Sequence, residues 1–149
     1  MKTYLIGSLH NPDIPVLGNY LREVGLEIFD SWHSAGPEAD SYWKQYSEAR
    51  GQTYSEALAD YSAQHVFEFD KHHLDTSGAG VLAMPCGKSG WAEMGYLTGQ
   101  GKPVFAYFDG IPAYSNWDVM LNFTHSSYYD KESLRYALVV QAKREEAQL

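Results

Sequence analysis

The chain has 149 residues, a formal net charge of −8 and a hydrophobic content of 44%. A chain of this length buries enough apolar surface to fold as one domain, which excludes the small scaffolds that depend on disulfides or a structural metal. The acidic balance disfavours nucleic-acid polymers and anionic membranes as partners, because binding to them needs a basic face. Small neutral or singly charged molecules remain possible as ligands.

The cysteine and hydropathy patterns limit the class of protein further. Cys86 is the only cysteine, so no intramolecular disulfide and no thiolate metal cluster can form. The N-terminal apolar run is too short for a signal-peptide core, and no stretch approaches the roughly 18 apolar residues that span a bilayer. We therefore expect a soluble cytoplasmic protein with one domain over residues 1–149.

The first thirty residues have the pattern of a β-α-β unit. Residues 2–8 are rich in β-forming side chains, and Asn11-Pro12 has the look of an N-cap followed by the first helical position. Apolar residues then recur at helical spacing as far as Gly25, and residues 26–30 form a second short strand. Because such crossovers are nearly always right-handed, the two strands are expected to be parallel.

The remainder of the chain continues the alternation of strands and helices. Residues 31–52 lack clean periodicity, and we interpret them as a covering loop with at most a short helix. The other expected elements are a helix from the capping box Thr53–Glu56 to about His73, strands at 80–84 and 103–108, a helix at 90–99 and a last helix capped by Asp130. This order predicts an α/β fold, a single doubly wound domain with a mostly parallel sheet of the flavodoxin-like or Rossmann-like type.

Ligands of open α/β sheets bind beyond the carboxyl ends of the strands, which here directs attention to residues 8–11, 85–93 and 109–117. The middle segment has a strand, a turn and a helix whose first turn is expected to carry Glu93. A helix N-terminus lowers the pKa of a nearby acid, so Glu93 is expected to be ionised at neutral pH and available as a nucleophile. A carboxylate that only complements the helix dipole fits the local pattern equally well.

A second carboxylate, Asp70, is expected near the end of the preceding helix and therefore on the same rim of the sheet. Two acids in one site can take different catalytic roles: one attacks an anomeric carbon, and the other assists the leaving group. Asp75 is a competing candidate. The sequence from Leu74 to Gly78 is typical of a turn that ends a helix, so we favour a structural role for Asp75.

Four motifs occur together over most of the chain: Tyr4-Leu5-Ile6-Gly7-Ser8, then Asp70, then Glu93-Met94-Gly95-Tyr96, then Gly101-Lys102-Pro103-Val104. With them the chain resembles the nucleoside 2-deoxyribosyltransferases and the related deoxynucleotide N-glycosidases. The resemblance implies that Glu93 is the nucleophile that forms a glycosyl-enzyme intermediate. It also implies that Asp70 contacts the base and helps its protonation.

The resemblance implies further substrate-binding residues. At the end of the first strand, where members of the family hold base or sugar, these are Tyr4, Gly7, Ser8 and Leu9. The segment Trp117–Met120 resembles one that family members lend to the neighbouring subunit, which implies roles for Asp118 and Met120. The chain is then expected to form a homo-oligomer with shared active sites.

One position departs from the family. Many of the transferases place an aspartate six residues before the nucleophile to bind the sugar, and related nucleotide hydrolases place a serine there, whereas this chain has Gly87. Lys88, Ser89 and the backbone amides of the turn up to Gly90 are candidates to replace those contacts with a hydroxyl or a 5′-phosphate. An ordinary helix start with a solvated lysine is the alternative.

Other polar and aromatic residues have more than one interpretation. Trp32, Trp43 and Tyr46 either seal an edge of the core, which we favour, or stack on a nucleobase. His65 and His72 share a helix face, but no third ligand completes a metal site, so no metal is expected.

Residues and resemblance together predict that the chain transfers a 2-deoxyribosyl group between nucleobases without a cofactor. The expected ligands are a small-molecule deoxynucleoside or deoxynucleotide and a free nucleobase. Two alternatives stay open, an N-glycosidase that hydrolyses the base–sugar bond of a 2′-deoxynucleoside or its 5′-monophosphate, and a non-catalytic nucleotide-sensing module. Pro85, Gly87 and Glu93 also keep the spacing of the loop of cytokinin-type phosphoribohydrolases. Among the glycosidase interpretations, we rank this one second.

Overall fold

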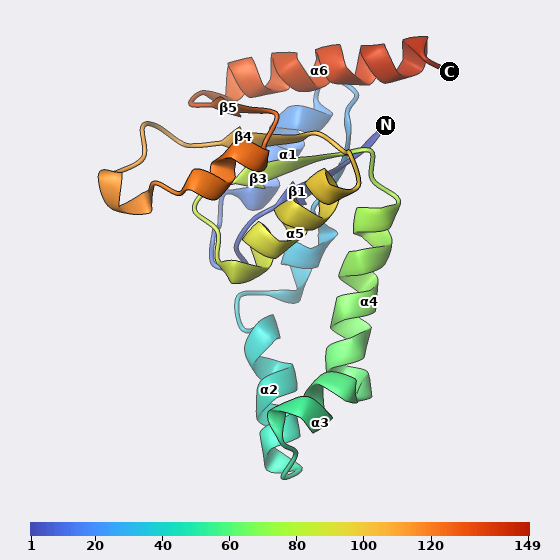
Figure 1. Ribbon diagram of the computed structural model, residues 1–149, viewed down its shortest axis with the longest axis vertical. Coiled ribbons are helices and arrows are strands. Elements are labelled where there is room, and N and C mark those ends of the chain that lie inside the picture. The colour runs from blue at the N-terminus through green and yellow to red at the C-terminus, as the bar shows by residue number, and fades with distance from the viewer.

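A computed structural model describes all residues, 1–149, as a five-stranded parallel sheet with helices on both faces (Figure 1). The strands are β1 (Lys2–Ile6), β2 (Glu27–Phe29), β3 (Ala79–Ala83), β4 (Val104–Tyr107) and β5 (Ser126–Tyr128). The helices are α1 (Ile14–Arg22), α2 (Ala39–Ala49), α3 (Tyr54–Ala59), α4 (Tyr61–Asp75), α5 (Lys88–Gly99) and α6 (Lys131–Ala147). Short 3-10 helices cover Ser31–Ala35, Tyr114–Asn116 and Val119–Phe123. The predicted doubly wound α/β fold is confirmed.

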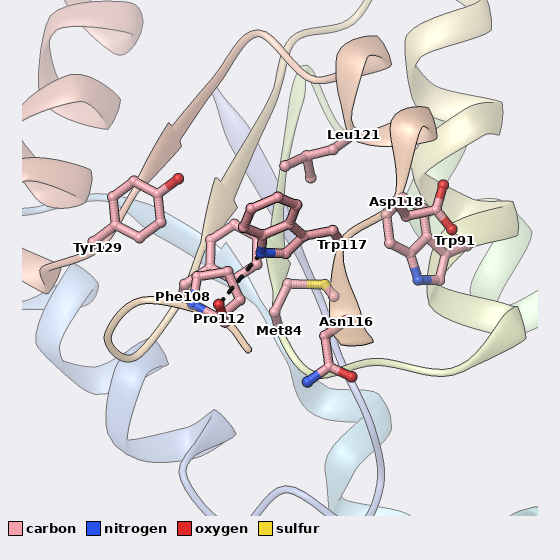
Figure 2. A pocket seen from close by; sticks show the side chains of 9 residues that line it. All are labelled: Met84, Trp91, Phe108, Pro112, Asn116, Trp117, Asp118, Leu121 and Tyr129. Carbon is pink, nitrogen blue, oxygen red and sulfur yellow. Dashed lines mark hydrogen bonds between the residues drawn. The ribbon is translucent and has the colours of Figure 1, made fainter. Parts of the chain in front are cut away.

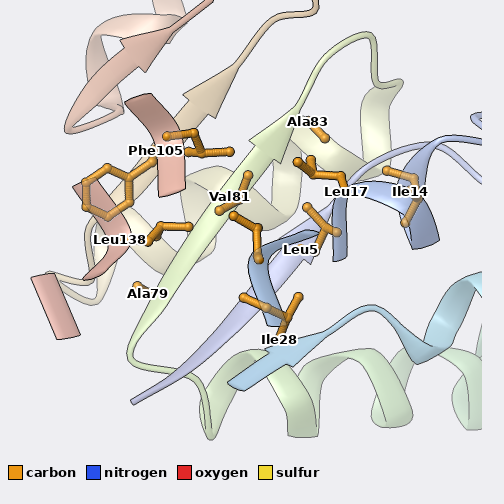
Figure 3. Packing of buried hydrophobic residues seen from close by; sticks show 11 residues of the cluster. Leu5, Ile14, Leu17, Ile28, Ala79, Val81, Ala83, Phe105 and Leu138 are labelled. Carbon is orange, nitrogen blue, oxygen red and sulfur yellow. The ribbon is translucent and has the colours of Figure 1, made fainter. Parts of the chain in front are cut away.

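The core has one layer on each face of the sheet, because side chains along a strand point alternately to opposite faces. Leu5 of β1 faces α1 and α6 and packs in a cluster with Leu17 and Leu138 (Figure 3). Its neighbours Tyr4 and Ile6 face the other way, into a cluster with Met94 and Leu97 of α5 and Leu74 of α4. Tyr4 is therefore directed at the helix that follows β3.

The helices α2 and α3 and the first half of α4 extend away from the sheet (Figure 1). The predicted covering loop over residues 31–52 is wrong, since it contains the 11 residues of α2. The predicted single helix from Thr53 is also wrong: its capping box is present, but the backbone of Asp60 is extended and separates α3 from α4. The Asp60 carboxylate accepts hydrogen bonds from the Tyr61 amide at 2.7 Å and from Gln52 at 2.6 Å, which stabilises the break.

Two predicted helix starts are shifted. Helix α1 begins at Ile14 rather than at Pro12, because the Asn11 side chain accepts a hydrogen bond from the Asp13 amide at 3.0 Å and forms a turn. Helix α5 begins at Lys88 rather than at Gly90, with Gly87 as its N-cap. Glu93 is consequently in the second turn of α5.

The edge strand β5 has no counterpart in the sequence analysis. Its three residues are Ser-Ser-Tyr, without apolar alternation, and it is held by parallel pairing with β4, in which Phe105 is opposite Ser126. The predicted cap at Asp130 is confirmed, since its carboxylate accepts a hydrogen bond from the Ser133 amide at 2.8 Å.

The strand order β2-β1-β3-β4-β5 gives the sheet a switch point between β1 and β3. From these neighbouring strands the chain continues in opposite directions along the sheet, so a crevice opens beyond their carboxyl ends. No helix combines the length and the apolar character that a membrane span would need.

Candidate active site

Tyr4 of β1, Asp70 of α4 and Glu93 of α5 meet beside the β1–β3 switch point. The Tyr4 side chain is 1% exposed and lies beside the Glu93 carboxyl, whose pKa it lowers. The negative charge of Asp70 acts on both Tyr4 and Glu93. Three residues that are far apart in the sequence are thus brought together, as expected for Asp70 and Glu93.

The Glu93 carboxyl is strongly perturbed by its surroundings. Burial raises its pKa to about 7, a hydrogen bond with Tyr4 lowers the pKa, and the charge of Asp70 raises it. One carboxyl oxygen, Oε2, is buried without a hydrogen-bond partner. Burial therefore opposes the ionised Glu93 that the helix start led us to expect: the residue lies beyond the first turn of α5, where the helix dipole has faded, and desolvation is the largest influence on its pKa.

The other two members of the site are perturbed by the same burial. Desolvation raises the pKa of Asp70 to about 6. Burial, followed by the charges of Glu93 and Asp70, raises the pKa of the Tyr4 hydroxyl far above its usual range. Tyr4 therefore remains protonated and can donate a hydrogen bond, while both acids exchange protons near neutral pH.

The turn before α5 is open to solvent at Gly87, where the resemblance noted in the sequence would place an aspartate. Nothing lies within 4 Å of a Cβ placed on Gly87, and Lys88 and Ser89 are exposed. Gly90 is different, because a Cβ there would lie 2.8 Å from Cys86 Sγ. The α5 N-terminus thus has no side-chain cap and faces free space.

Sequence reasoning gave Cys86 no place in the site, although it lies in the same turn. Burial and the charge of Glu93 raise the pKa of the Cys86 thiol to about 11, so it stays uncharged at neutral pH. The position of Cys86 between the end of β3 and the start of α5 was the signal in the sequence that could have indicated this placement.

The loop that follows β1 is stabilised by hydrogen bonds between its own residues. Ser8 Oγ accepts a hydrogen bond from the His10 amide at 3.1 Å, and the Ser8 carbonyl accepts one from Asn11. Gly7 packs closely against α1, because a Cβ at that position would lie 2.5 Å from Ile14 Cδ1 and the end of the Ile14 side chain would have to shift. Gly7, Ser8 and Leu9 are half-buried at the end of β1.

A separate cavity of about 220 Å³ lies beyond the ends of β3 and β4 (Figure 2). Its walls include the aromatic side chains of Trp91, Phe108, Trp117 and Tyr129. Asp118 lines this cavity of its own chain, and its carboxylate accepts a hydrogen bond from the Met120 amide at 2.9 Å. Neither Asp70 nor Glu93 is among the residues that line this cavity.

Asp75 has the structural surroundings that we favoured. Its carboxylate accepts hydrogen bonds from Lys71 at 2.7 Å and from the Tyr96 hydroxyl, and these lower its pKa strongly. Trp32 behaves as a core seal, because it packs against both clusters and its indole donates to the Leu5 carbonyl at 2.8 Å.

The two outer aromatic residues do not seal the core. Tyr46 is 57% exposed beside Arg50, and the Trp43 indole donates to Asp40 within α2 at 3.0 Å. No three His, Cys, Asp or Glu side chains gather in a way that could hold a metal ion.

The fold was compared with solved structures. A 2-deoxyribosyltransferase from the psychrotolerant bacterium Bacillus psychrosaccharolyticus superposes with a TM-score of 0.59 at 16% identity, over 91% of this chain and 90% of that one. The chain shares the fold of this enzyme. A conserved protein from Enterococcus faecalis V583 superposes with a TM-score of 0.60 at 12% identity, over 91% of this chain and 95% of that one. No protein-family model and no curated protein sequence matches the chain.

Proposed function

We propose that the chain transfers a 2-deoxyribosyl group between nucleobases through a covalent glycosyl-Glu93 intermediate. The observation that carries this proposal is the meeting of Tyr4, Asp70 and Glu93, with one Glu93 oxygen buried and unpartnered. A buried carboxyl without a partner lowers the stability of a fold, and such groups concentrate at functional sites. The likeness in fold to a 2-deoxyribosyltransferase supports the same chemistry.

The proposed reaction has two displacements. In the first, an ionised Glu93 oxygen bonds to C1′, the C1′–N bond breaks, and the base leaves with the electron pair and a proton from Asp70. In the second, a nitrogen of the acceptor base bonds to C1′, the C1′–O bond to Glu93 breaks, and the acceptor's proton passes to Asp70. Both acids return to their starting state, so the reaction needs no cofactor.

The sugar suits this mechanism. A 2-deoxyribosyl group lacks the 2′-hydroxyl, whose electron withdrawal disfavours the positive charge that develops at C1′. Tyr4 donates a hydrogen bond to the Glu93 carboxylate and so holds the attacking oxygen. Water in place of the acceptor base would give hydrolysis by the same steps.

We assign the sugar end of the ligand to the turn before α5. Gly87 leaves open space there, and the exposed Lys88 ammonium and Ser89 hydroxyl stand beside the free amides of the helix N-terminus. This arrangement suits a 5′-hydroxyl or a 5′-phosphate. Lys88→Met is expected to lower kcat/KM for deoxynucleoside 5′-monophosphates about tenfold and to leave deoxynucleosides within about twofold, because only the phosphate attracts the cation. Equal loss for both substrates would contradict the assignment.

We further propose a homo-oligomer in which Asp118 and Met120 of one copy complete the site of its neighbour. The support is the number of exposed apolar side chains that residues 111–123 carry, which are Ile111, Tyr114, Trp117, Val119, Met120 and Phe123. Apolar surface that is left exposed in a single chain can mark an interaction surface.

The experiment that tests the proposed reaction is a base-exchange assay. Purified protein is incubated with 2′-deoxynucleosides or their 5′-monophosphates, with and without a second free base, and the products are separated by chromatography. A new nucleoside that forms only with the second base supports transfer. Free base without exchange indicates the N-glycosidase, and binding without base release indicates the sensing module. Glu93→Ala must lose the activity, whereas Glu68→Ala, which removes an exposed carboxylate of α4, must keep it.

A further inference from the structure

A polar cluster around Asp75 joins the C-terminal end of α4 to α5. The Asp75 carboxylate accepts hydrogen bonds from the Tyr96 hydroxyl and from Gln100 Nε2, the latter at 3.3 Å. Lys102 Nζ donates to the backbone carbonyls of Leu74 at 3.0 Å and of Asp75 at 3.1 Å. All three donors belong to α5 or to the segment that follows it, so the cluster is a link between two helices.

The link lies about one helical turn from each carboxyl of the candidate site. Tyr96 follows Glu93 by three positions and shares its side of α5, because residues three or four apart are neighbours on a helix. Leu74 follows Asp70 by four positions on α4 and is buried in the cluster that also contains Leu97 of α5. The apolar contact and the hydrogen bond to Asp75 together fix how α4 and α5 are aligned.

We propose that Asp75 and Tyr96 are positioning residues, whose hydrogen bond sets the separation of the Asp70 and Glu93 carboxyls. The effect on rate rests on the proposed transfer reaction, whereas the effect on the carboxyl pair does not. Neither residue is among those that perturb Glu93 directly, so they act through the placement of their helices. A misplacement of about 1 Å costs on the order of 100-fold in rate for groups that must align with a reacting atom.

Burial is the main cause of the raised pKa of Glu93, and the charge of Asp70 raises it further by a repulsion that falls as the separation grows. Loosening the link between α4 and α5 is therefore expected to lower the pKa of Glu93 towards its ordinary value. A residue that serves folding alone would change the melting temperature without changing this pKa.

The test compares Tyr96→Phe, Asp75→Ala and Asp75→Asn with the wild-type chain. Carboxyl titrations followed by NMR report the pKa of Glu93, and base-exchange kinetics report kcat and KM. For Tyr96→Phe and Asp75→Ala we expect a lower pKa of Glu93 and a kcat lower by about 10- to 100-fold, with KM within about threefold. Asp75→Asn keeps an acceptor for the Tyr96 hydroxyl, so its Glu93 pKa and its kcat are expected to be close to those of the wild-type chain.

Tyr136→Phe is the matched control, because it removes an exposed tyrosine hydroxyl of α6 that forms no hydrogen bond with the rest of the chain. The proposal is overturned when Tyr96→Phe lowers the melting temperature but leaves the pKa of Glu93 unchanged. A wild-type chain that releases no base would refute the proposed reaction alone, since the titration would still decide whether Tyr96 and Asp75 set the carboxyl separation.

Discussion

Asp70 and Glu93 stand on separate helices, and the charge of Asp70 raises the pKa of Glu93. Burial raises the pKa of both carboxyls, to about 6 for Asp70 and about 7 for Glu93, so the two groups titrate as a coupled pair close to neutral pH. The proposed reaction uses one singly protonated form of this pair, an ionised Glu93 beside a protonated Asp70.

The first prediction concerns pH. The rate should rise as Glu93 ionises through its pKa of about 7 and should fall as Asp70 loses its proton above about 6. We therefore expect a narrow bell-shaped profile of kcat/KM, with its maximum between about pH 6 and 7. Assays of base release across pH 4.5–9 measure this profile. A rate that stays constant from pH 5 to 9 would exclude this pair as nucleophile and acid.

The second prediction concerns Glu93→Gln. The exchange should lower base release by more than about 10⁴-fold, because the nucleophile is lost. It should also stabilise the fold above pH 7. The folded pKa of about 7 exceeds the ordinary value of 4.5, so ionising Glu93 lowers the free energy of unfolding as pH rises through this window.

The magnitude of that stabilisation follows from the pKa difference. At about 1.4 kcal/mol per pKa unit, the gain at pH 8 is on the order of 3–3.5 kcal/mol and should vanish near pH 4. Urea denaturation at the two pH values measures it. Equal stabilities of the variant and the wild type at pH 8 would show that Glu93 is not held in a desolvated site.

The third prediction concerns Tyr4→Phe. The hydrogen bond with Tyr4 lowers the pKa of Glu93, so its loss should move the acidic limb of the pH profile to higher pH. The activity should consequently fall more at pH 6 than at pH 8. Tyr136→Phe again serves as the control, and an unshifted acidic limb in Tyr4→Phe would remove Tyr4 from the site.

The fourth prediction concerns the exposed segment after β4. Val119 and Phe123 are 74% and 62% exposed in the single chain, so changing both to Asp should leave its folding intact. If this segment forms the contact between copies of the chain, the double variant should have a smaller molar mass than the wild type by light scattering after size-exclusion chromatography. Its rate of base release should be lower by about tenfold or more. An unchanged molar mass would contradict the proposed shared site.

The sequence predicted the fold because its strands and caps depend on local patterns. Tyr4, Leu5 and Ile6 alternate between two apolar layers, and Thr53 and Asp130 use side-chain oxygens to begin helices. The break at Asp60 was missed because it depends on Gln52 and on Arg50, which donates to its carboxylate at 2.7 Å. Such partners are placed by tertiary structure.

Sequence reasoning anticipated that Asp70 and Glu93 lie close together, but it did not anticipate how burial shifts their pKa values. Spacing and resemblance selected Asp70 and Glu93, but the shift of the start of α5 to Lys88 removed the helix dipole as the dominant influence. Burial replaced it, and burial depends on residues from three elements. The link from Asp75 to Tyr96 could not be predicted for the same reason, since 21 positions separate the two residues.

The most direct test of the proposed intermediate is mass spectrometry of the protein after a brief incubation with a 2′-deoxynucleoside and a rapid acid quench. We predict that the peptide containing Glu93 carries one 2-deoxyribosyl group as an ester, which disappears when an acceptor base is added before the quench. An unmodified Glu93 peptide in a sample that is releasing base would contradict a covalent glycosyl-Glu93 intermediate.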